Sequence, residues 1–175
     1  MDDIKIYDNF LDYKDYHSLK EVFCCTDEFK GASFFYAPTI LDKKENYSYD
    51  FQFTHGLYDG VLREELGVLS PYFDLLNPIL KKLKGEKLYK AKVNIRTRSP
   101  QIYESGFHVD IPKKVEGYKT AVYYINTNDG YTLFKSGEKV KSIGNRIVVF
   151  DGQLFHSGTT CTDQNIRSVL NINYS

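Results

Sequence analysis

Three side chains in the second half of the chain are of types that together can bind a metal ion. His108 and Asp110 are separated by one residue and lie in a run that is typical of a β-strand. Because side chains alternate between the two faces of a strand, the imidazole and the carboxylate point the same way, and Val109 points to the other face. His156 follows much later, after the strand-like run 147–150. A barrel would bring this histidine back to the first two side chains.

Two histidines and one carboxylate on one face of a metal leave its other coordination positions open. This set is the facial triad that holds iron(II) in non-haem oxygenases. A His-x-Asp triplet also arises by chance, and a His–Asp pair in a strand can be a plain structural hydrogen bond. The interpretation as a metal site therefore depends on the elements that surround the triplet.

The second half of the chain has the pattern of a β-rich domain. From Leu88 onward, short runs rich in Val, Ile, Tyr and Phe are separated by turn residues. Several short strands at regular spacing predict a sandwich or a barrel. The expected strands are 89–97, 106–111, 120–126, 131–134, 139–143, 146–150 and 167–174.

The first half of the chain mixes helices with strands. Asp12 is predicted to cap a first helix, which ends near Cys24. Ser70-Pro71 has the pattern of an N-cap followed by proline at the first helical position, and an apolar stripe over residues 75–83 continues this second helix until Gly85 ends it. Both helices would pack outside the barrel as a support. The short strands expected here are 4–7, 32–36 and 49–53.

Composition argues against membrane and nucleic acid as partners. Lysine plus arginine and aspartate plus glutamate each number 23, so the chain has no net charge that would attract a polyanion or an anionic membrane. No apolar run approaches the roughly 18 residues that span a bilayer. Cys24, Cys25 and Cys161 are interpreted as reduced thiols. We therefore expect a cytoplasmic protein whose 175 residues form one domain.

Six motifs follow one another in the second half of the chain. In order they are Gly-Phe-His-Val-Asp at 106–110, Thr-Ala-Val-Tyr-Tyr-Ile-Asn at 120–126, Gly-Tyr-Thr-Leu-Phe at 130–134, Gly-Asn-Arg-Ile-Val-Val-Phe at 144–150, His-Ser-Gly at 156–158, and Arg167. Each is common alone, but in this order and at this spacing they resemble the 2-oxoglutarate/iron(II) oxygenase superfamily. The sequence looks most like the prolyl-hydroxylase-like branch and its small members carried by marine bacteriophages.

The resemblance implies a fold and a set of cofactors. The fold would be mainly β with flanking helices (α+β), a double-stranded β-helix or cupin-like jelly-roll barrel supported by the N-terminal helices. Residues 1–86 would form the support, and residues 87–175 the barrel with the metal site. Iron(II) would bind to His108, Asp110 and His156, and 2-oxoglutarate and O2 would be the cosubstrates. If the gene is carried by a phage, the protein would work in the host cytoplasm.

The resemblance assigns Arg167 and Tyr124 to the cosubstrate. A guanidinium group can bind a carboxylate through two parallel hydrogen bonds, and in the family this is the distal carboxylate of 2-oxoglutarate. Tyr124 matches a family tyrosine that hydrogen-bonds the same carboxylate. From the residues alone, Tyr124 could equally be a core aromatic, and Arg167 could belong to a surface ion pair.

Strand alternation adds four candidate pocket residues. If Arg167 faces the pocket, Asn171 and Asn173 share its face of the last strand and could hold water or substrate near the metal. Asn94 and Arg96 share a face of the strand before the first ligand. Arg96 stands roughly where prolyl hydroxylases have a pocket tyrosine, so it would contact the cosubstrate or an anionic substrate. The open alternative is that all four are solvent-facing polar residues.

Two departures from the family pattern bear on the ligands. Val169 stands where some relatives carry a serine, so the cosubstrate would be held without that hydroxyl. The loop 97–105 differs from the prolyl-hydroxylase pattern, and in the family it borders the site. This loop and the polar stretch 42–47 are the candidate lids. His17 and His55 match no ligand position and are interpreted as structural histidines.

The implied function is hydroxylation of a substrate, with release of succinate and CO2. A prolyl residue of a peptide or protein is the leading candidate, while a free amino acid, another small metabolite or a nucleobase stays open, as does the oligomeric state. A cupin-type metalloenzyme without 2-oxoglutarate is one alternative, and Arg167 with Tyr124 argues against it. A non-catalytic jelly-roll binding or structural domain is the other, and the complete triad with its arginine argues against that.

Overall fold

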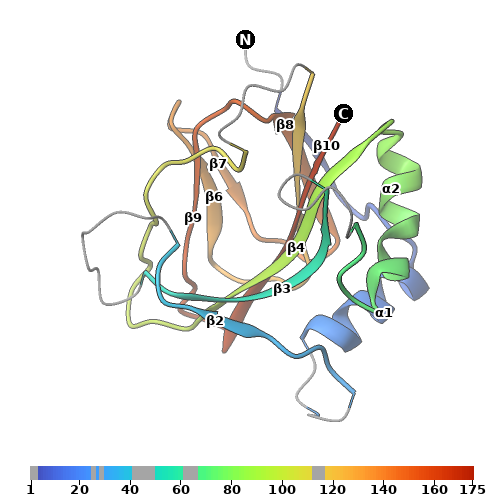
Figure 1. Ribbon diagram of the computed structural model, residues 1–175. Coiled ribbons are helices and arrows are strands. Elements are labelled where there is room, and N and C mark those ends of the chain that lie inside the picture. The colour runs from blue at the N-terminus through green and yellow to red at the C-terminus, as the bar shows by residue number, and fades with distance from the viewer. Residues whose placement is uncertain (1–3, 25–26, 28–29, 41–49, 61–66, 112–116) are drawn as a thin grey trace.

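The computed structural model describes residues 4–24, 27, 30–40, 50–60, 67–111 and 117–175, which form two facing antiparallel sheets (Figure 1). The larger sheet contains β1 (Lys5–Tyr7), β2 (Phe35–Ala37), β3 (Gln52–Asp59), β4 (Leu88–Thr97), β5 (Lys119–Tyr124), β8 (Arg146–Asp151) and β10 (Ile166–Tyr174). The smaller sheet contains β6 (Tyr131–Phe134), β7 (Lys139–Lys141) and β9 (His156–Gly158). Within the described residues, the strand orders are β1-β8-β5-β10-β4-β3-β2 and β7-β6-β9.

The chain passes back and forth between the two sheets. After β4 in the larger sheet, isolated bridges of Glu104 to Thr159 and of His108 to His156 attach the next segment to the smaller sheet. β5 returns to the larger sheet, β6 and β7 belong to the smaller one, and β8, β9 and β10 alternate again. This path is a double-stranded β-helix, so the predicted mainly β jelly roll is confirmed.

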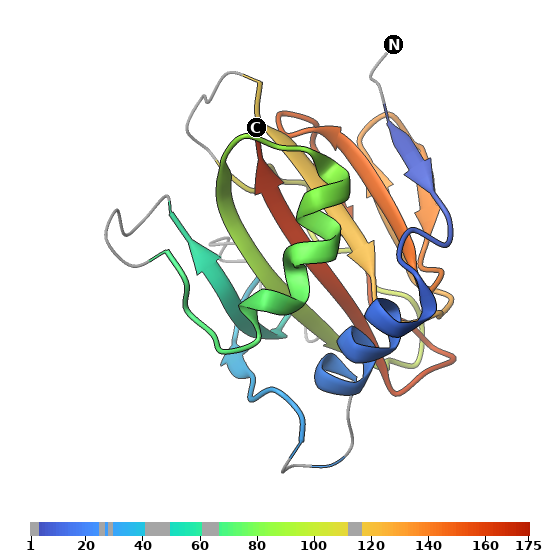
Figure 2. The ribbon, with the colours of Figure 1, turned by 90° about the vertical axis from the view of Figure 1, so that its right-hand side faces the viewer.

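Two helices cover the face of the larger sheet that points away from the smaller one (Figure 2). They are α1 (Tyr13–Phe23) and α2 (Asn77–Leu83), and a short 3-10 helix, η1 (Phe73–Leu76), leads into α2. Alternate side chains of the sheet meet them in an apolar core, as the predicted support requires. Its buried members include Leu19, Phe23, Leu76, Ile79, Ala91, Val93, Ala121, Tyr123, Ile147, Leu170 and Ile172.

Asp12 begins the first helix, as predicted. Its carboxylate accepts a hydrogen bond from the backbone N–H of Asp15 at 2.9 Å, which satisfies one of the otherwise free N–H groups of the first turn. Leu19 and Phe23 are the buried residues of this helix. At its end, the hydroxyl of Ser168 in β10 donates to the carbonyl of Phe23 at 3.4 Å, so the last turn is tied to the centre of the sheet.

The second helix begins later than predicted. The Ser70 hydroxyl accepts a hydrogen bond from the N–H of Tyr72 at 3.1 Å, so it shapes a turn into η1 and does not cap α2. Nε2 of His55 lies 2.7 Å from the same hydroxyl, and Nδ1 of His55 lies 2.6 Å from the carbonyl of Ser33. These contacts give His55 a structural place, away from the other histidines.

The same helix also ends differently, because Lys84 and not Gly85 adopts the left-handed conformation, with φ of 54°. Gly85 meets a different requirement. A Cβ at this position would lie 2.4 Å from the ring of Tyr174, so the glycine allows the chain to pass close to the end of β10.

Some predicted strands have other bounds. Residues 106–111 form no regular strand and pair through the bridge at His108 alone, while the short strand β9 was not predicted. The strand expected at 32–36 begins at Phe35, and the one expected at 49–53 is the longer β3, with position 49 outside the described residues. Strand formation depends on the neighbouring strand as much as on residue type, and pairing with β6 imposes it on His-Ser-Gly.

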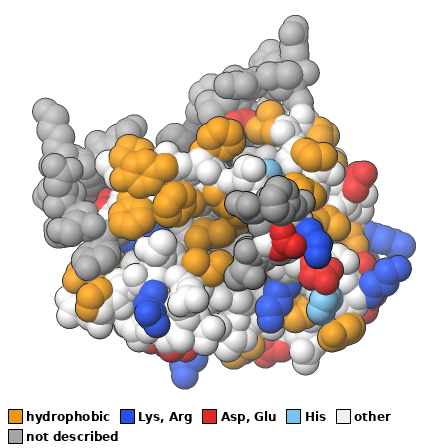
Figure 3. Space-filling view, turned by 90° about the horizontal axis from the view of Figure 1, so that it is seen from below, with side chains coloured by type: hydrophobic (Ala, Val, Ile, Leu, Met, Phe, Trp, Pro, Cys, Tyr) orange, Lys and Arg blue, Asp and Glu red, His pale blue; other side chains and the backbone are white. Residues whose placement is uncertain are grey.

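β2 lies at the edge of the larger sheet and carries exposed aromatic rings. Phe35 and Tyr36 are 75% and 61% exposed. The ring of Tyr36 lies 5.9 Å from that of Phe51 and 5.7 Å from that of Phe53, so these rings hold β2 against β3. Figure 3, seen from the side of β2, shows hydrophobic side chains gathered on this face.

Two cysteines, Cys24 and Cys161, are free thiols in the structure, and Cys25 lies outside the described residues. Burial raises the pKa of the Cys24 thiol to about 11, so it stays protonated. None of the helices in the described residues is long and apolar enough to cross a membrane.

Candidate metal centre and its cavity

The two predicted histidine ligands meet in the smaller sheet. His108 and His156 form a bridge in which each backbone N–H donates to the carbonyl of the other, at 2.9 and 3.0 Å. Side chains of directly opposed residues lie side by side on one face, and here the ring centroids are 4.8 Å apart. Nε2 of His108 is 3.9 Å from Asp110 Oδ1, and Nε2 of His156 is 3.7 Å from Asp110 Oδ2. The structure thus brings all three side chains together.

The backbone around the two histidines sets their tautomers. Nδ1 of His108 lies 3.1 Å from the carbonyl of Gly106, and Nδ1 of His156 lies 3.0 Å from the carbonyl of Leu154. A carbonyl can only accept, so in both rings the hydrogen is on Nδ1. The lone pair is then on Nε2, which faces Asp110. Carbonyl partners of this kind orient histidines that ligate metals.

Asp110 is held by side chains of two neighbouring strands. The Asn171 amide donates to Oδ1 at 2.8 Å, and the Asn173 amide donates to Oδ2 at 3.0 Å. The Thr120 hydroxyl adds a third hydrogen bond, to Oδ2 at 3.2 Å. Strand alternation predicted that both asparagines face the pocket, but the structure gives them a different task from holding water or substrate. They fix the position of the carboxylate, and Thr120, which the sequence analysis missed, assists them.

Burial and charge favour the protonation states that bind metal. Burial lowers the pKa of His108, and repulsion from His156 lowers it further, so the imidazole is kept neutral. Burial by itself would raise the pKa of Asp110, but the two histidines and the two asparagine amides outweigh it, so the net pKa is lowered. Neutral imidazoles and an ionised carboxylate are the forms that ligate a metal.

The three donors fit one divalent ion. Neighbouring donors of a facial set with bonds of about 2.1 Å lie about 3 Å apart, so the histidine–carboxylate distances of 3.9 and 3.7 Å would shorten by less than about 1 Å around a bound ion. All three ligand atoms lie within 4.8 Å of one another. The set leaves the remaining positions of an ion open to the cavity beside it, which is the arrangement that suits non-haem iron(II).

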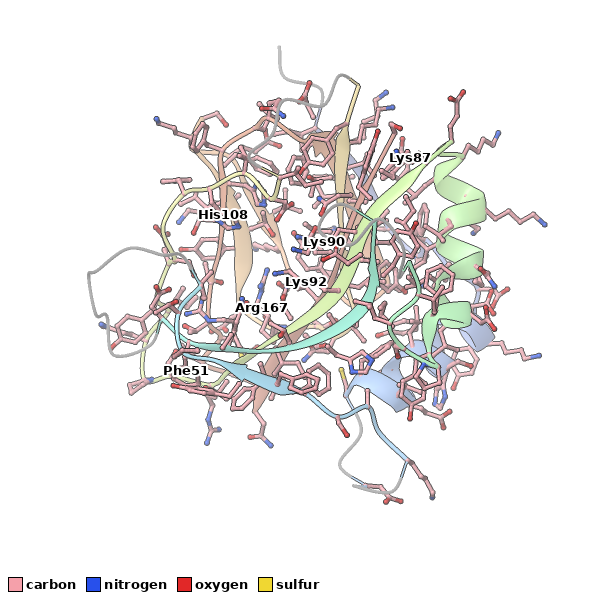
Figure 4. All side chains as sticks on the ribbon, in the orientation of Figure 1. Phe51, Lys87, Lys90, Lys92, His108 and Arg167 are labelled. Carbon is pink, nitrogen blue, oxygen red and sulfur yellow. The ribbon has the colours of Figure 1, made fainter. Side chains whose placement is uncertain are left out.

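A cavity of about 370 Å³ lies beside these side chains, between the two sheets. His108, Lys92 and Arg167 all lie in this space (Figure 4). Of the four predicted pocket residues, three line the cavity, so they do not form a solvent-facing row. These three are Asn94, Arg96 and Asn171. Asn173 is 1% exposed and lies behind Asp110.

Arg167 is 3% exposed, so it does not belong to a surface ion pair. Nε donates to the Ser142 hydroxyl at 2.9 Å and Nη2 to the carbonyl of Tyr131 at 3.2 Å, and these bonds fix the plane of the guanidinium. Gly130 makes room for it, because a Cβ there would lie 2.7 Å from Cδ of Arg167. The side chain lines the cavity, where a fixed guanidinium is prepared to bind a carboxylate.

Tyr124 lies one layer farther from the cavity than Arg167. It is completely buried, its ring lies under the guanidinium with 5.8 Å from Cζ to the ring centroid, and its hydroxyl donates to Thr132 Oγ1 at 2.8 Å. Among the described residues, Thr132 lines the cavity and Tyr124 does not. The sequence analysis missed Thr132, although it is the threonine of the Gly-Tyr-Thr-Leu-Phe motif.

Two cations of β4, Lys92 and Arg96, also face the cavity, with Asn94 between them. In the pairing with β10, Lys92 is opposite Asn171 and Arg96 is opposite Arg167. Burial lowers the pKa of Lys92, with help from Lys90. Burial, followed by repulsion from Arg167, lowers the pKa of Arg96 to about 10. The sequence analysis missed Lys92, although alternation along the strand from Asn94 and Arg96 would have found it.

The loop 97–105 reaches the cavity at its end, through Ser105. The Ser99 hydroxyl donates to Thr160 Oγ1 at 2.6 Å, and the N–H of Tyr103 donates to the same oxygen at 2.9 Å. Ser105 lines the cavity, and its hydroxyl accepts a hydrogen bond from Nη1 of Arg96. The second candidate lid, 42–47, lies outside the described residues.

No protein-family model and no curated protein matches this sequence. Solved structures do match its fold. A 2OG-Fe(II) oxygenase family oxidoreductase from Burkholderia pseudomallei is similar with a TM-score of 0.67 at 11% identity, over 98% of this chain and 84% of that one. The fold is therefore shared with a member of the 2OG-Fe(II) oxygenase family.

Two prolyl hydroxylases share the fold as well. One is the viral collagen prolyl hydroxylase of Paramecium bursaria Chlorella virus-1 in its 2OG complex, with a TM-score of 0.60 at 13% identity over 98% of this chain and 95% of that one. The other is a prolyl hydroxylase from Trichoplax adhaerens in complex with a peptide of hypoxia inducible factor, with a TM-score of 0.61 at 15% identity over 98% and 83%. This chain therefore shares its fold with 2-oxoglutarate/iron(II) oxygenases, among them prolyl hydroxylases.

Proposed function

We propose that this protein is an iron(II)- and 2-oxoglutarate-dependent dioxygenase that hydroxylates its substrate. One observation carries the proposal: the facial set of His108, Asp110 and His156 opens into the same cavity that Arg167 lines. A metal ligand set and a buried carboxylate-binding group in one small cavity match the two ends of 2-oxoglutarate. The shared fold supports this assignment, since one of the similar structures is a complex with 2OG.

Each cofactor has residues that would hold it. Iron(II) would bind to Nε2 of the two histidines and to the Asp110 carboxylate. The distal carboxylate of 2-oxoglutarate would bind to Arg167 with Thr132 beside it, and Tyr124 would support both from below. When bound, these groups supply the oxidation, in which 2-oxoglutarate is converted to succinate and CO2 and one oxygen atom of O2 reaches the substrate.

The protein itself contributes the positions and the charges of the groups that would hold the metal and the cosubstrate. The asparagine pair and Thr120 hold the Asp110 carboxylate in one orientation, and the two backbone carbonyls hold the imidazoles. The buried Arg167 fixes the direction of the cosubstrate without having to move. The two sheets and Ser105 form the walls of the cavity beside the open coordination positions. Such orientation is the part of the catalysis that a protein supplies to a metal and its cosubstrate.

A prolyl residue of a peptide or protein is the substrate that the resemblance suggests. In support, two of the similar structures are prolyl hydroxylases, one of them holding a peptide. A small molecule is the other substrate class, and a cavity of this size accepts both. A jelly-roll binding domain would not require a buried arginine beside a metal set, so the dioxygenase is the better supported function.

An anaerobic titration tests the proposal. Iron(II) is added to the protein, then 2-oxoglutarate, and the visible charge-transfer band of the chelated cosubstrate is followed. We expect a saturable band in the wild type and none in His108→Ala. Arg167→Gln should bind iron normally and need about 10-fold or more additional 2-oxoglutarate, since it loses charge-assisted hydrogen bonds.

His17→Ala is the matched control, because it removes an exposed histidine that faces Glu21 on α1. It should give the wild-type band, and admitting O2 should yield succinate in both. Iron binding without any response to 2-oxoglutarate would indicate a metalloenzyme of the cupin type. No binding of iron would leave a binding domain as the better conclusion.

A further inference from the structure

We propose that the substrate is a small organic acid, a free amino or hydroxy acid, whose carboxylate binds to Lys92 beside the metal centre. This inference rests on the proposed function and deepens it, because it names the substrate class of the same cavity. It differs from a prolyl residue inside a peptide, which has no carboxylate of its own.

Lys92 lies at the metal end of the cavity. In the pairing of β4 with β10 it is opposite Asn171, whose amide holds Asp110 at 2.8 Å. Lys92, His108 and Asp110 line the same cavity. Arg96 lies farther along β4, opposite Arg167, at the end that would receive the distal carboxylate of the cosubstrate. The two cations of β4 therefore serve different ends of the cavity.

With iron(II) and 2-oxoglutarate bound, the cavity would keep an excess of positive charge that another anion would neutralise. Iron(II) is a dication and 2-oxoglutarate a dianion, so their charges cancel. Lys92, Arg96 and Arg167 line the cavity, and Asp110 is the one carboxylate among its described lining residues. Asp50 also attracts Arg96, so among the described residues Lys92 is the cavity cation with the least compensation once Asp110 ligates the metal. Lys92 is half-buried, and an ammonium group partly withdrawn from water next to a dication is stabilised when an anion accompanies it.

Two buried acceptors indicate what else the ligand carries. Oδ1 of Asn94 and Oδ1 of Asn171 are buried and have no hydrogen-bond partner within the described part of the chain. Both side chains line the cavity. Buried polar atoms are nearly always paired, so a ligand with N–H or O–H donors is expected opposite them. An ammonium or hydroxyl group next to a carboxylate meets both requirements.

The size of the cavity agrees with a small ligand. Its volume of about 370 Å³ has to hold 2-oxoglutarate as well, and it is near the lower limit of about 300 Å³ for small-molecule sites. A compact acid fits in the remaining space. The acid would be held by its carboxylate at Lys92 with its neighbouring carbon toward the open coordination positions, so the lysine would determine both specificity and orientation.

The test uses the anaerobic complex of the protein with iron(II) and 2-oxoglutarate. The probes are the proteinogenic amino acids, lactate and malate, each next to its carboxamide. The shift of the charge-transfer band reports binding, and succinate formation after O2 is admitted reports coupled turnover. We expect one or more acids to shift the band and to accelerate succinate formation, with the matching amide at least about 10-fold weaker.

Variants of Lys92 assign the effect to this side chain. Lys92→Met and Lys92→Gln should weaken binding of the active acid at least about 10-fold, measured on complexes already saturated with iron(II) and 2-oxoglutarate. Lys90→Met is the matched control, because Lys90 is on the same strand and does not line the cavity in the described structure. It should behave as the wild type.

The possible failures are distinguishable. If no charge-transfer band forms with 2-oxoglutarate, the proposed function itself is wrong. If the band forms but no acid shifts it, if amides act as strongly as acids, or if a peptide with an internal prolyl residue is the best ligand, the small-acid substrate is wrong. Equal losses of affinity for the acid in Lys90→Met and Lys92→Met would also overturn it. They would indicate a general electrostatic effect of positive charge and not a carboxylate-binding site at Lys92.

Discussion

The two faces of the larger sheet have opposite chemistry, although the same strands form both. On β10, Leu170 and Ile172 point to the helices and are completely buried in an apolar core. Arg167, Asn171 and Asn173 point to the smaller sheet, where they contact the metal set or the cavity. β4 repeats the division, with alanine and valine on one face and charged or amide side chains on the other. Because side chains alternate with a period of two residues, the residues that stabilise the fold and those that form the site lie on opposite faces of the same strands.

This difference shows how a barrel of modest size tolerates a polar interior. Buried polar and charged groups are costly unless they are paired. On the inner face many are paired, as in the hydrogen bonds of Asn173 and of Arg167, and others face the cavity where ligands would bind. The helix-covered face supplies the apolar burial that offsets the remaining cost. The comparison predicts that substitutions on the two faces affect different measurements.

The largest effect is expected on the outer face. Leu170→Ala should lower the free energy of unfolding by about 2–5 kcal/mol, because it opens a cavity in a fully buried core. Urea denaturation of the metal-free protein measures this. Iron(II) affinity of the folded variant should equal that of the wild type. A 10-fold loss of iron affinity would show that the two faces are not independent.

Asn173→Ala tests the inner face of the same strand. Iron(II) affinity should fall by about 10- to 100-fold, as is usual when a residue that orients a ligand is removed. Isothermal titration under anaerobic conditions measures it. Asn126→Ala is the matched control. Its amide donates to the carbonyl of Ile166 and accepts from the N–H of Ser168, both on β10 but away from the metal set. Iron affinity that is unchanged in Asn173→Ala would refute its positioning role.

Tyr124→Phe tests a residue of the inner face that lies behind the residues lining the cavity. The hydroxyl donates to Thr132 and does not line the cavity in the described structure, so 2-oxoglutarate should bind no more than about 5-fold more weakly, the value of one ordinary hydrogen bond. The anaerobic band titration measures this. A loss as large as that of Arg167→Gln would mean that Tyr124 contacts the cosubstrate directly, as the resemblance implied.

The smallest effect is expected at the exposed rim, outside both faces. Asp8 accepts two hydrogen bonds from Arg146, at 2.6 and 2.9 Å. Hydrogen bonding by this guanidinium holds the pKa of Asp8 below its ordinary value. Asp8→Asn should cost less than about 1 kcal/mol, because the Asp8 carboxylate is largely exposed to solvent.

The pH dependence of this pair has a definite sign. A carboxyl group with a lowered folded-state pKa stabilises the protein above its unfolded pKa of about 3.9, and this contribution is lost as pH falls through the folded value. The stabilities of wild type and Asp8→Asn should therefore converge in acid and differ at neutral pH. A difference that grows in acid would contradict the assignment. Unfolding midpoints across this pH range measure it.

The sequence by itself determined the elements whose pattern is local. Alternation placed Arg167 with Asn171 and Asn173 on one face, because a strand has a fixed period of two. The close spacing of His108 and Asp110 also indicated that they act together, although residues 106–111 form no regular strand and Val109 lines the same cavity. The order of the strands and the first helix with its Asp12 cap were also predictable, since capping and turn residues act over a few positions. These local rules were sufficient for a sandwich or barrel and for much of the set of residues that faces its interior, while the jelly roll itself came from the family resemblance.

Only the tertiary structure decided what those residues contact. That Asn171 and Asn173 hold Asp110, that Thr132 stands between Tyr124 and the cavity, and that Lys92 reaches the metal end all depend on the register between strands far apart in the chain. Register and side-chain reach are set by the packing of the whole barrel and leave no local pattern. The sequence could therefore name the metal set, while the roles of the residues around it come from how the two sheets meet.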